Sequence, residues 1–469
     1  MKAKSKTKAY DVIVIGGGSA GFSAAEAARA RGVRVALVEK GLLGGECPNW
    51  ACVPTKALLK SARMYESAKG MADYGVHTGR VTYSFQEMMK RKNAVVATLT
   101  GAGERFARLF ADLGIAVIEG AAVFVDKYTI QVNDTFYTAK SFVIATGAED
   151  VLPPIEGLQT SGFLGFKDVV SLKRKPSSIC IIGGGPVGCE FATFFSLLDT
   201  RVTLLQRANS LLDREDPEIA GIAAKELAQR GVQIFTDTKT LRVRRSGLKK
   251  QVTFQVGRKQ RQTVRVDAVL VAVGKRANVD GLHLSAAKVK LDEKGGLLLK
   301  ETLQTSAPHI FAAGDVTSGY LFTHTGHYEG FIAGTNAALR ATSPRAKLER
   351  RDLRVVPRVT FVHPEVASVG FTVAQAKAEK KQVLVGSFPI GALGRALTDG
   401  DRRGLVKLVV EKGSGKILGG HIVGERAGEL IHEVALAMHV GATAHDLSTL
   451  IHAYPTYSEA ITAAAGDVL

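Results

Sequence analysis

Asp11-Val-Ile-Val-Ile-Gly-Gly-Gly-Ser-Ala-Gly21 predicts a buried β-strand, a glycine-rich turn and the start of a helix. The stretch Ser178-Ile-Cys-Ile-Ile-Gly-Gly-Gly-Pro-Val-Gly188 repeats this pattern in the middle of the chain. In both, an apolar run precedes Gly-x-Gly-x-x-Gly and an apolar helical stretch follows it, as in the βαβ unit that binds dinucleotides. Two such units predict an α/β fold with two Rossmann-type domains.

Three glycines of the first turn have separate physical tasks. Gly16 permits the tight turn, Gly18 lets the backbone approach a pyrophosphate, and Gly21 lets helix and strand pack closely. The N-terminus of the following helix stabilises the phosphate charge. The second strand of this unit, at 33–38, leads into Glu39, whose carboxylate is expected to accept hydrogen bonds from a ribose.

The second turn repeats this logic through Gly183, Gly185 and Gly188, with one difference. Gln206 stands where the first unit has its terminal glutamate. A carboxylate at this place holds the 2′-hydroxyl of NAD and repels a 2′-phosphate, so Gln206 removes that repulsion and Arg207 can pair with a phosphate. These residues favour NADPH. The alternative is that Arg207 points to solvent and either NADPH or NADH binds.

Cys47-Pro-Asn-Trp-Ala-Cys52 places two thiols in one short segment. A turn of this length can bring their Cα atoms within the roughly 7 Å that a disulfide requires. A helix is predicted from Pro54, and its N-terminus would lower a thiol pKa. Glu46, which precedes the pair, is expected to face solvent. Two dinucleotide sites and a dithiol imply an electron relay, in which one nucleotide supplies a hydride and the other exchanges electrons with sulfur.

The composition is that of an ordinary globular protein with a basic surface. Its 469 residues predict about three domains. No apolar run reaches the roughly 18 residues of a membrane span, and the basic start at 1–8 leads into a strand rather than a cleavage site, so the cytoplasm is expected. The net charge is +18, with basic stretches at 242–245, 249–250 and 345–351. These stretches indicate either an anionic partner or a solvated surface, and no nucleic-acid motif accompanies them.

Other elements are predicted from periodicity. Between the two units we expect helices at 56–70 and 85–113, strands near 115–118, 121–125, 128–132 and 136–139, and a buried strand in 142–147. A similar buried strand is expected at 269–274. After about residue 345 the pattern changes to strands at 355–360, 405–410 and 420–423, followed by helices at 426–440 and 458–465. This last part predicts a separate α+β domain.

Gly44-Gly-Glu-Cys-Pro-Asn-Trp-Ala-Cys-Val-Pro-Thr-Lys56 resembles the redox-disulfide segment of the class I pyridine nucleotide–disulfide oxidoreductases. That family includes dihydrolipoamide dehydrogenase, glutathione reductase and mercuric reductase. The resemblance covers nearly the whole chain. It implies an FAD-binding domain at 1–152 and 276–346, an NAD(P)-binding domain at 153–275, a C-terminal dimerisation domain at 347–469, and a homodimeric FAD enzyme that uses NADPH or NADH.

The resemblance also implies roles for individual residues. Cys52 is the thiol next to the flavin, Cys47 is the interchange thiol that faces the substrate, and Lys56 lies near flavin N5 paired with Glu190. The alternative for Glu190 is that it merely ends a helical turn. Trp50 is expected to wall the flavin pocket. The implied cofactor-binding set is Gly16, Gly18, Ser19, Ala20, Gly21, Glu39, Lys40, Gly45, Lys56, Thr146, Gly147, Gly183, Gly185, Gly188, Gln206, Arg207, Gly274, Gly314 and Asp315.

The segment His452-Ala-Tyr-Pro-Thr-Tyr-Ser-Glu459 departs from part of the family. Relatives that act on thiols carry a histidine five residues before this glutamate, as acid and base, whereas this chain has Tyr454. A phenol with a pKa near 10 is a poor base for a thiol, which opposes lipoamide turnover. Tyr454 and Glu459 are expected to complete the active site of the other subunit, and His452 matches an accompanying histidine.

The electron acceptor is left open between three classes. A tyrosine at position 454 resembles mercuric reductase and favours a soft metal ion or another small acceptor, although this chain lacks that enzyme's C-terminal cysteine pair. The overall match favours a lipoyl-like or glutathione-like disulfide. A quinone needs no acid or base at the dithiol. A flavoprotein that only binds a partner through its basic surface is the alternative of a different class. No resident metal site is expected from His324 and His327, and Cys180 and Cys189 are expected to be buried.

Overall fold

The chain folds into two compact units, each assembled from three stretches of sequence. The structure, a computed structural model, describes residues 7–293 and 295–469, so most of the predicted basic tail at 1–8 lies outside the described residues. Unit 1 comprises the described residues of Met1–Ala57, Glu87–Val151 and Gly274–Asp352. Unit 2 comprises Leu58–Gln86, Leu152–Val273 and Leu353–Leu469.

Unit 1 contains a seven-stranded sheet in the order β3-β2-β1-β6-β5-β4, in which β16 also pairs with β6. Its strands β1, β2, β3, β6 and β16 run parallel, and β4 and β5 are antiparallel additions. The strands of this unit are β1 (Thr7–Ile15), β2 (Val35–Glu39), β3 (Ala116–Glu119), β4 (Ala122–Phe124), β5 (Thr129–Val132), β6 (Thr135–Ile144), β7 (Ala148–Asp150), β15 (Lys275–Ala277) and β16 (Ile310–Ala312).

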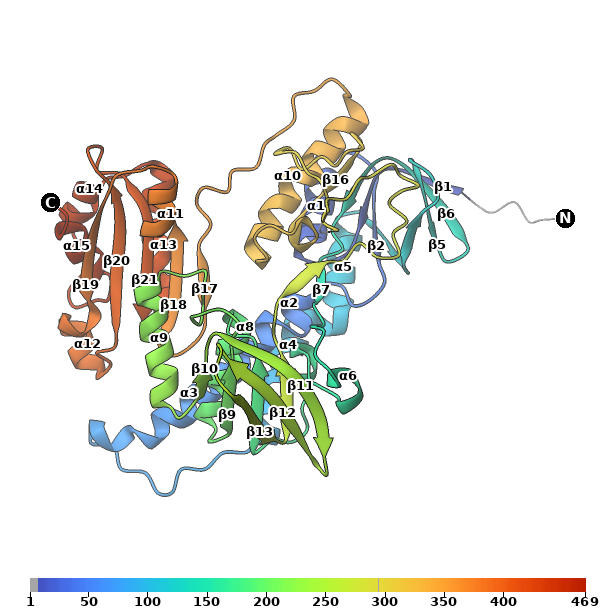
Figure 1. The fold of residues 1–469 in the computed structure, drawn as a ribbon. Coiled ribbons are helices and arrows are strands. Elements are labelled where there is room, and N and C mark those ends of the chain that lie inside the picture. Colours follow the sequence, from blue (N-terminus) through green and yellow to red (C-terminus); the bar gives the residue numbers. More distant parts are fainter. Residues whose placement is uncertain (1–6, 294) are drawn as a thin grey trace. The chain divides into compact units, whose positions relative to one another are not determined.

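Both faces of the parallel strands are buried, as a Rossmann-type sheet requires. On one face, Val12 and Val14 pack with the helices α1 (Ser19–Ala30) and α10 (Thr323–Thr342). The two helices lie side by side in Figure 1, and a Cβ at Gly334 would come within 2.1 Å of the Ala24 carbonyl oxygen. On the other face of the sheet, Ile13 packs in a second apolar cluster that includes Phe142. The helices α2 (Glu46–Asn49), α4 (Phe85–Thr100) and α5 (Glu104–Asp112) complete the order, and α3 (Cys52–Lys69) begins in unit 1.

Unit 2 contains three further sheets. A parallel sheet, β10-β9-β8-β14, repeats the strand arrangement around the first turn, an antiparallel sheet joins β11, β12 and β13, and a five-stranded antiparallel sheet has the order β17-β18-β21-β20-β19. The strands are β8 (Ser178–Ile182), β9 (Arg201–Leu205), β10 (Gln233–Phe235), β11 (Thr238–Ser246), β12 (Lys249–Val256), β13 (Arg261–Val266), β14 (Ala268–Val271), β17 (Arg358–Thr360), β18 (Glu365–Gly370), β19 (Val383–Pro389), β20 (Gly404–Glu411) and β21 (Ile417–Gly424).

The helices of unit 2 cover these sheets. They are α6 (Leu158–Ser161), α7 (Phe166–Val169), α8 (Pro186–Leu197), α9 (Pro217–Gln229), α11 (Val373–Ala378), α12 (Gly394–Asp399), α13 (Ala427–Val440), α14 (Ala444–Thr449) and α15 (Glu459–Gly466). In the C-terminal part, Ile431 of α13 and Ile461 of α15 share one apolar core with Ile422 of β21. The predicted α/β class with two Rossmann-type sheets and a C-terminal α+β domain is therefore confirmed.

Several element predictions need correction. The strands expected at 136–139 and 142–147 form one strand, β6. The helix expected at 85–113 is interrupted, because Gly101 and Gly103 have positive φ angles of 54° and 95°. The strand expected at 355–360 is confined to β17, which begins directly after Pro357, a residue without an N–H to donate. The strands β18 and β19 were not predicted.

Candidate functional site

The first glycine turn has the geometry of a pyrophosphate cradle. Gly16 has a φ of 106°, and a Cβ at Gly21 would lie 1.8 Å from the Gly16 carbonyl oxygen. A Cβ at Gly18, by contrast, would contact only the Cα of Gly45, at 3.8 Å. Gly18 precedes α1, so the helix N-terminus and its N–H groups face this space. The open space at Gly18 and the N–H groups at the start of α1 fit the pyrophosphate of FAD.

Glu39 closes the base of the same turn. One carboxylate oxygen accepts the N–H of Gly17 at 2.6 Å, and the other accepts the N–H of Gly41 at 2.7 Å. These bonds fix the carboxylate at the C-terminal end of β2. A carboxylate can accept more than two hydrogen bonds, so a ribose hydroxyl can still be bound there.

The second turn reproduces the first in unit 2. Gly183 has a φ of 115°, a Cβ at Gly188 would lie 1.9 Å from the Gly183 carbonyl oxygen, and a Cβ at Gly185 would meet nothing within 4 Å. The amide oxygen of Gln206 accepts the N–H of Gly184 at 3.0 Å, as Glu39 does in unit 1. The neutral Gln206 therefore replaces the carboxylate without changing the turn.

The structure brings the two cysteines of the predicted redox pair together. Cys47 lies in α2 and Cys52 is the first residue of α3, so the helix begins two residues earlier than the predicted start at Pro54. Both are free thiols and half-buried. The hydrogen bond with Cys52 and burial raise the pKa of the Cys47 thiol, whereas the hydroxyl of Thr323 and the charge of Lys56 oppose that rise.

Thr323 is a site residue that the sequence did not indicate. Its hydroxyl lies 3.6 Å from the sulfur of Cys52, and its carbonyl oxygen accepts the hydroxyl of Ser19 at 3.0 Å. One residue at the start of α10 therefore touches both the dithiol and the first turn of α1. No local pattern marks Thr323, because the contact joins residues 271 positions apart.

Glu46 does not simply face solvent, which corrects the expectation. Its carboxylate forms an ion pair with Lys275, the first residue of β15. The same lysine lies close enough to Asp315 to lower its pKa, but burial, with Glu46 and Glu329, outweighs this and raises the pKa of Asp315 to about 6. The carboxylates of Glu46, Asp315 and Glu329 therefore lie close enough to interact in unit 1, together with the ammonium of Lys275.

Glu329 holds the loop that carries Gly314 and Asp315. It lies on α10 and is 1% exposed. One oxygen accepts the N–H of Gly314 at 2.9 Å, and the other accepts a guanidinium N–H of Arg351 at 2.6 Å. No local pattern indicated this role, since a glutamate within a helix is more often exposed.

Thr146 and Gly147 follow β6 and are tied to a distant segment. The hydroxyl of Thr146 donates to the carbonyl oxygen of Asn278 at 2.6 Å, and the side-chain amide of Asn278 donates to the Thr146 carbonyl oxygen at 3.2 Å. Gly147 and Gly274 both have positive φ angles, and a Cβ on either would meet no atom within 4 Å. These glycines leave room beside the turn, as a bound nucleotide requires.

Lys56 and Glu190 lie in different units. Lys56 is on α3, within unit 1, and Glu190 is buried on α8 of unit 2. A carboxylate oxygen of Glu190 accepts the N–H of Phe361 at 3.0 Å. The pairing of Lys56 with Glu190 stays a prediction. Cys180 and Cys189 are fully buried, as expected.

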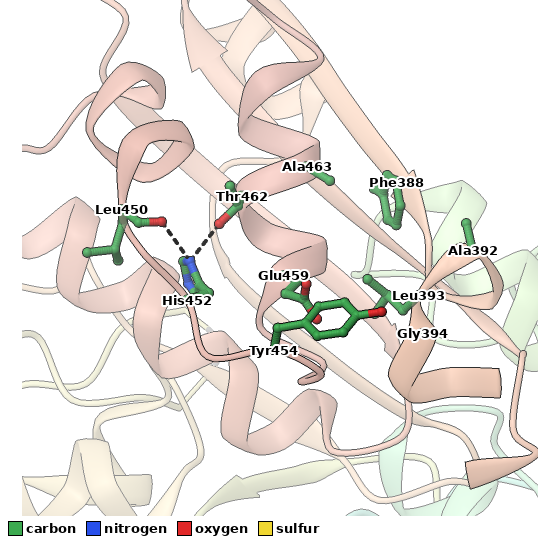
Figure 2. Close-up of a pocket in the computed structure, with 10 residues that line it drawn as sticks. All are labelled: Phe388, Ala392, Leu393, Gly394, Leu450, His452, Tyr454, Glu459, Thr462 and Ala463. Atoms are coloured by element: carbon green, nitrogen blue, oxygen red, sulfur yellow. Dashed lines mark hydrogen bonds between the residues drawn. The ribbon is translucent and has the colours of Figure 1, made fainter. Parts of the chain in front are cut away.

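The C-terminal segment lines a pocket of about 510 Å³ (Figure 2). Tyr454 is 79% exposed, and its hydroxyl lies beside Gly394. Glu459, at the start of α15, accepts the N–H of Thr456 at 2.9 Å. The pocket therefore presents a free-standing phenol next to a carboxylate that is held in place.

His452 is engaged within its own domain. Its Nε2 lies 2.8 Å from a carboxylate oxygen of Glu433, and its Nδ1 lies 2.7 Å from the hydroxyl of Thr462 and 3.1 Å from the carbonyl oxygen of Leu450. Figure 2 shows the two contacts of Nδ1. This arrangement supports the interpretation of His452 as an accompanying histidine.

A second group of polar side chains lies in unit 2. His363, Asp401 and Glu425 each offer an atom within 4.8 Å of the others. The guanidinium of Arg403 donates to both oxygens of Asp401, at 2.8 and 2.6 Å. Burial, with the charges of Arg403 and two other arginines, lowers the pKa of His363 to about 3. The group therefore has the character of a charged network rather than of a metal site.

Comparisons with known proteins agree with this geometry. Residues 10–330 match the family described as pyridine nucleotide-disulphide oxidoreductase, and residues 356–465 match its dimerisation domain, which supports a homodimer. No described helix is long and apolar enough to cross a membrane.

Individual relatives cover nearly the whole chain. A mercuric reductase of Staphylococcus aureus is 37% identical over 97% of this chain and 82% of its own. A dihydrolipoyl dehydrogenase of Geobacillus stearothermophilus is 36% identical over 96% and 94%. The HOCl-induced flavoprotein disulfide reductase RclA from Escherichia coli superposes with a TM-score of 0.86 at 30% identity, over 98% of this chain and all of that one. The chain therefore belongs to the pyridine nucleotide–disulphide oxidoreductases, enzymes that use FAD and NAD(P)H.

Proposed function

We propose that the chain passes electrons from NADPH through the Cys47–Cys52 pair to a soft metal ion, or to another small acceptor of similar chemistry. The observation that carries this proposal is Tyr454, which is 79% exposed beside Glu459 where thiol-directed relatives have a histidine. The mercuric reductase named above supports it as a relative. We further propose that the individual residues have the roles that the family resemblance implies. The proposed domain boundaries are 1–152 and 276–346 for FAD binding, 153–275 for NAD(P) binding and 347–469 for dimerisation. We also propose that the protein is located in the cytoplasm.

In this proposal the two glycine turns bind the pyrophosphates of FAD and NADPH. Bound FAD supplies two-electron exchange between a nicotinamide and a disulfide. Gln206 leaves room for the 2′-phosphate of NADPH, and Arg207 pairs with it. Glu39 binds the FAD ribose, and Asp315 binds the ribityl region.

The chain's own thiols then carry the electrons. Two electrons and two protons convert the Cys47–Cys52 disulfide into two thiols. Thr323 and Lys56 stabilise negative charge on the sulfurs, because both oppose the rise in the pKa of Cys47. The two thiols release their two protons as they bind a soft divalent cation as thiolates, and two electrons then pass to the metal as the disulfide forms again.

Disulfide reduction is the second candidate. The dihydrolipoyl dehydrogenase relative and the retained Glu459 favour it, and Tyr454 opposes it. A quinone is a third acceptor class, which needs the nucleotide sites but no acid or base at the dithiol.

Anaerobic turnover with four acceptors tests these proposals. The enzyme is reduced with NADPH or NADH and then offered Hg(II), oxidised lipoamide, oxidised glutathione or a quinone. We expect NADPH-driven reduction of Hg(II), lost in Cys47→Ser. Quinone turnover that survives Cys47→Ser would instead indicate transfer that bypasses the thiols. The variant Tyr454→His separates the first two candidates, since it should raise lipoamide turnover if the missing imidazole limits it. Faster turnover of a disulfide than of Hg(II) by the unmodified enzyme would refute the proposal.

A further inference from the structure

One segment of unit 2 holds more than half of the chain's excess positive charge. Between residues 238 and 266 the sequence has ten lysines and arginines and no aspartate or glutamate, whereas the whole chain has a net charge of +18. These residues form the three-stranded antiparallel sheet β11-β12-β13, which we call the basic sheet. Neither nucleotide turn nor the dithiol lies in it.

One face of the basic sheet accounts for its stability. Val243, Val252, Phe254 and Val266 point into an apolar core. The alternate residues point the other way, so the register places Arg244, Gln251 and Arg265 in one row across three strands. The outward face is therefore lined with guanidinium, ammonium and uncharged polar groups.

Few of these cations are neutralised within the molecule. Arg242 pairs with Glu156, and Lys249 lies 3.7 Å from Asp267. In the described part of the chain, no carboxylate forms an ion pair with the remaining cations near the β11–β12 turn, which are Arg244, Arg245, Lys250 and Arg265.

The positive charges beside the β11–β12 turn do not stabilise the basic sheet. Arg245 and Lys250 stand directly opposite each other across the two strands. Like charges in this position destabilise a sheet. Burial and the charge of Arg245 lower the pKa of Lys250, which shows that the two cations interact unfavourably.

An apolar side chain stands at the end of this turn. Ser246 pairs with Lys249, so the loop has only two residues, and Gly247 has a φ of 64°, as a hairpin turn requires. The second loop residue is Leu248, which is fully exposed, at 102% of its reference area. In Figure 1 the ends of β11 and β12 project beyond the neighbouring strands of unit 2.

We propose that the β11–β12 turn docks on an anionic lipid surface, with Leu248 inserted among the acyl chains and the flanking cations on the headgroups. An exposed apolar tip with basic flanks is typical of peripheral membrane contact. A nucleic-acid surface is disfavoured, because the only aromatic residue of this segment is Phe254, which is buried and cannot stack on a base. A protein partner is disfavoured because protein interfaces are rich in aromatic residues and poor in lysine.

Vesicle co-sedimentation of the FAD-loaded dimer tests this proposal. The probes are phosphatidylcholine vesicles with and without 30% phosphatidylglycerol (roughly a third anionic lipid), and a mixed-sequence DNA duplex is the competing polyanion. We expect binding to the anionic vesicles alone, weakened by salt.

Two matched double variants locate the contact. Arg244→Gln/Arg265→Gln removes two charges of the outward face near the β11–β12 turn, and Arg258→Gln/Lys259→Gln removes two at the opposite end of the sheet. Each cation near an anionic surface contributes about fivefold in affinity, so the first variant should lose about 25-fold and the second much less. Because Arg244 and Arg265 are exposed and form no ion pair within the described residues, their replacement should leave folding intact. NADPH oxidation should be unchanged in both variants.

The tip variant supplies the decisive comparison. Leu248→Ser keeps the charge and should weaken binding to anionic vesicles by at least about tenfold. The proposal is overturned if no vesicle binding occurs, if the two double variants lose equally, if Leu248→Ser binds like the unmodified enzyme, or if the duplex binds more tightly than the vesicles.

Discussion

Replacement of Arg351 by alanine should destabilise unit 1 selectively, through one buried carboxylate. The side chain of Glu329 is 2% exposed and that of Arg351 is 23% exposed, and their contact is 2.6 Å. Removal of one partner of such a pair costs about 3–5 kcal/mol, because it leaves a charge buried without compensation.

The destabilisation by Arg351→Ala should therefore be about 3–5 kcal/mol at pH 7. Because Glu329 also holds Gly314, the affinity for FAD should fall with it.

The neighbouring arginine provides the control. Arg350 pairs with Glu301 at the surface, where the two side chains are 69% and 62% exposed, so Arg350→Ala should cost less than about 1 kcal/mol. The assay is urea denaturation followed by the release of FAD fluorescence, which reports on unit 1. Equal losses of stability in Arg351→Ala and Arg350→Ala at pH 7 would refute the reasoning.

Three further outcomes are expected. Gln206→Glu keeps the hydrogen bond to the turn but places a charge beside the nucleotide, so steady-state kinetics should show at least about a tenfold fall in the preference for NADPH over NADH. Burial holds the pKa of His363 at about 3 in the folded protein rather than 6.5, so only the unfolded chain gains a proton at this residue as pH falls through 6.5. The free energy of unfolding should therefore decline by about 1.4 kcal/mol per pH unit between pH 6.5 and 3. Urea titrations at several pH values should show a smaller decline in His363→Gln than in the unmodified protein. The raised pKa of Asp315, about 6 rather than 3.8, means that stability falls as pH rises through 3.8 to 6; Asp315→Asn should therefore stabilise the FAD-free protein at pH 7 by up to about 3 kcal/mol in thermal unfolding, while FAD titration shows weaker binding.

The glycine turns were predictable because backbone sterics leave little choice. A side chain at Gly21 or Gly188 would overlap a carbonyl oxygen within the same turn. Only glycine fits these positions, so the glycine pattern in the sequence predicts the geometry of the turn. The equivalence of Glu39 and Gln206 followed from spacing alone. In the structure, Glu39 accepts the N–H of Gly17 and Gln206 accepts the N–H of Gly184.

The missed features depend on contacts between distant residues. Glu46 meets Lys275 across 229 positions, and Cys52 meets Thr323 across 271. Neither contact has a periodicity that a local pattern could reveal. The buried position of Glu329 was missed for the same reason, since its partners come from the loop at Gly314 and from Arg351.

The order of the strands in unit 1 also has a consequence for biosynthesis. The strand β16 (Ile310–Ala312) adds to β6, whose last residue is Ile144, so the sheet cannot be completed until the ribosome has released more than 300 residues. The nascent N-terminal half must therefore persist with one unfilled edge beside β6, exposed to unwanted pairing. The entropy lost in closing so long a loop grows only slowly with its length, so the delay is set by translation rather than by the search for the partner strand. A holdase chaperone that binds this edge co-translationally would be expected to raise the yield of flavin-loaded protein.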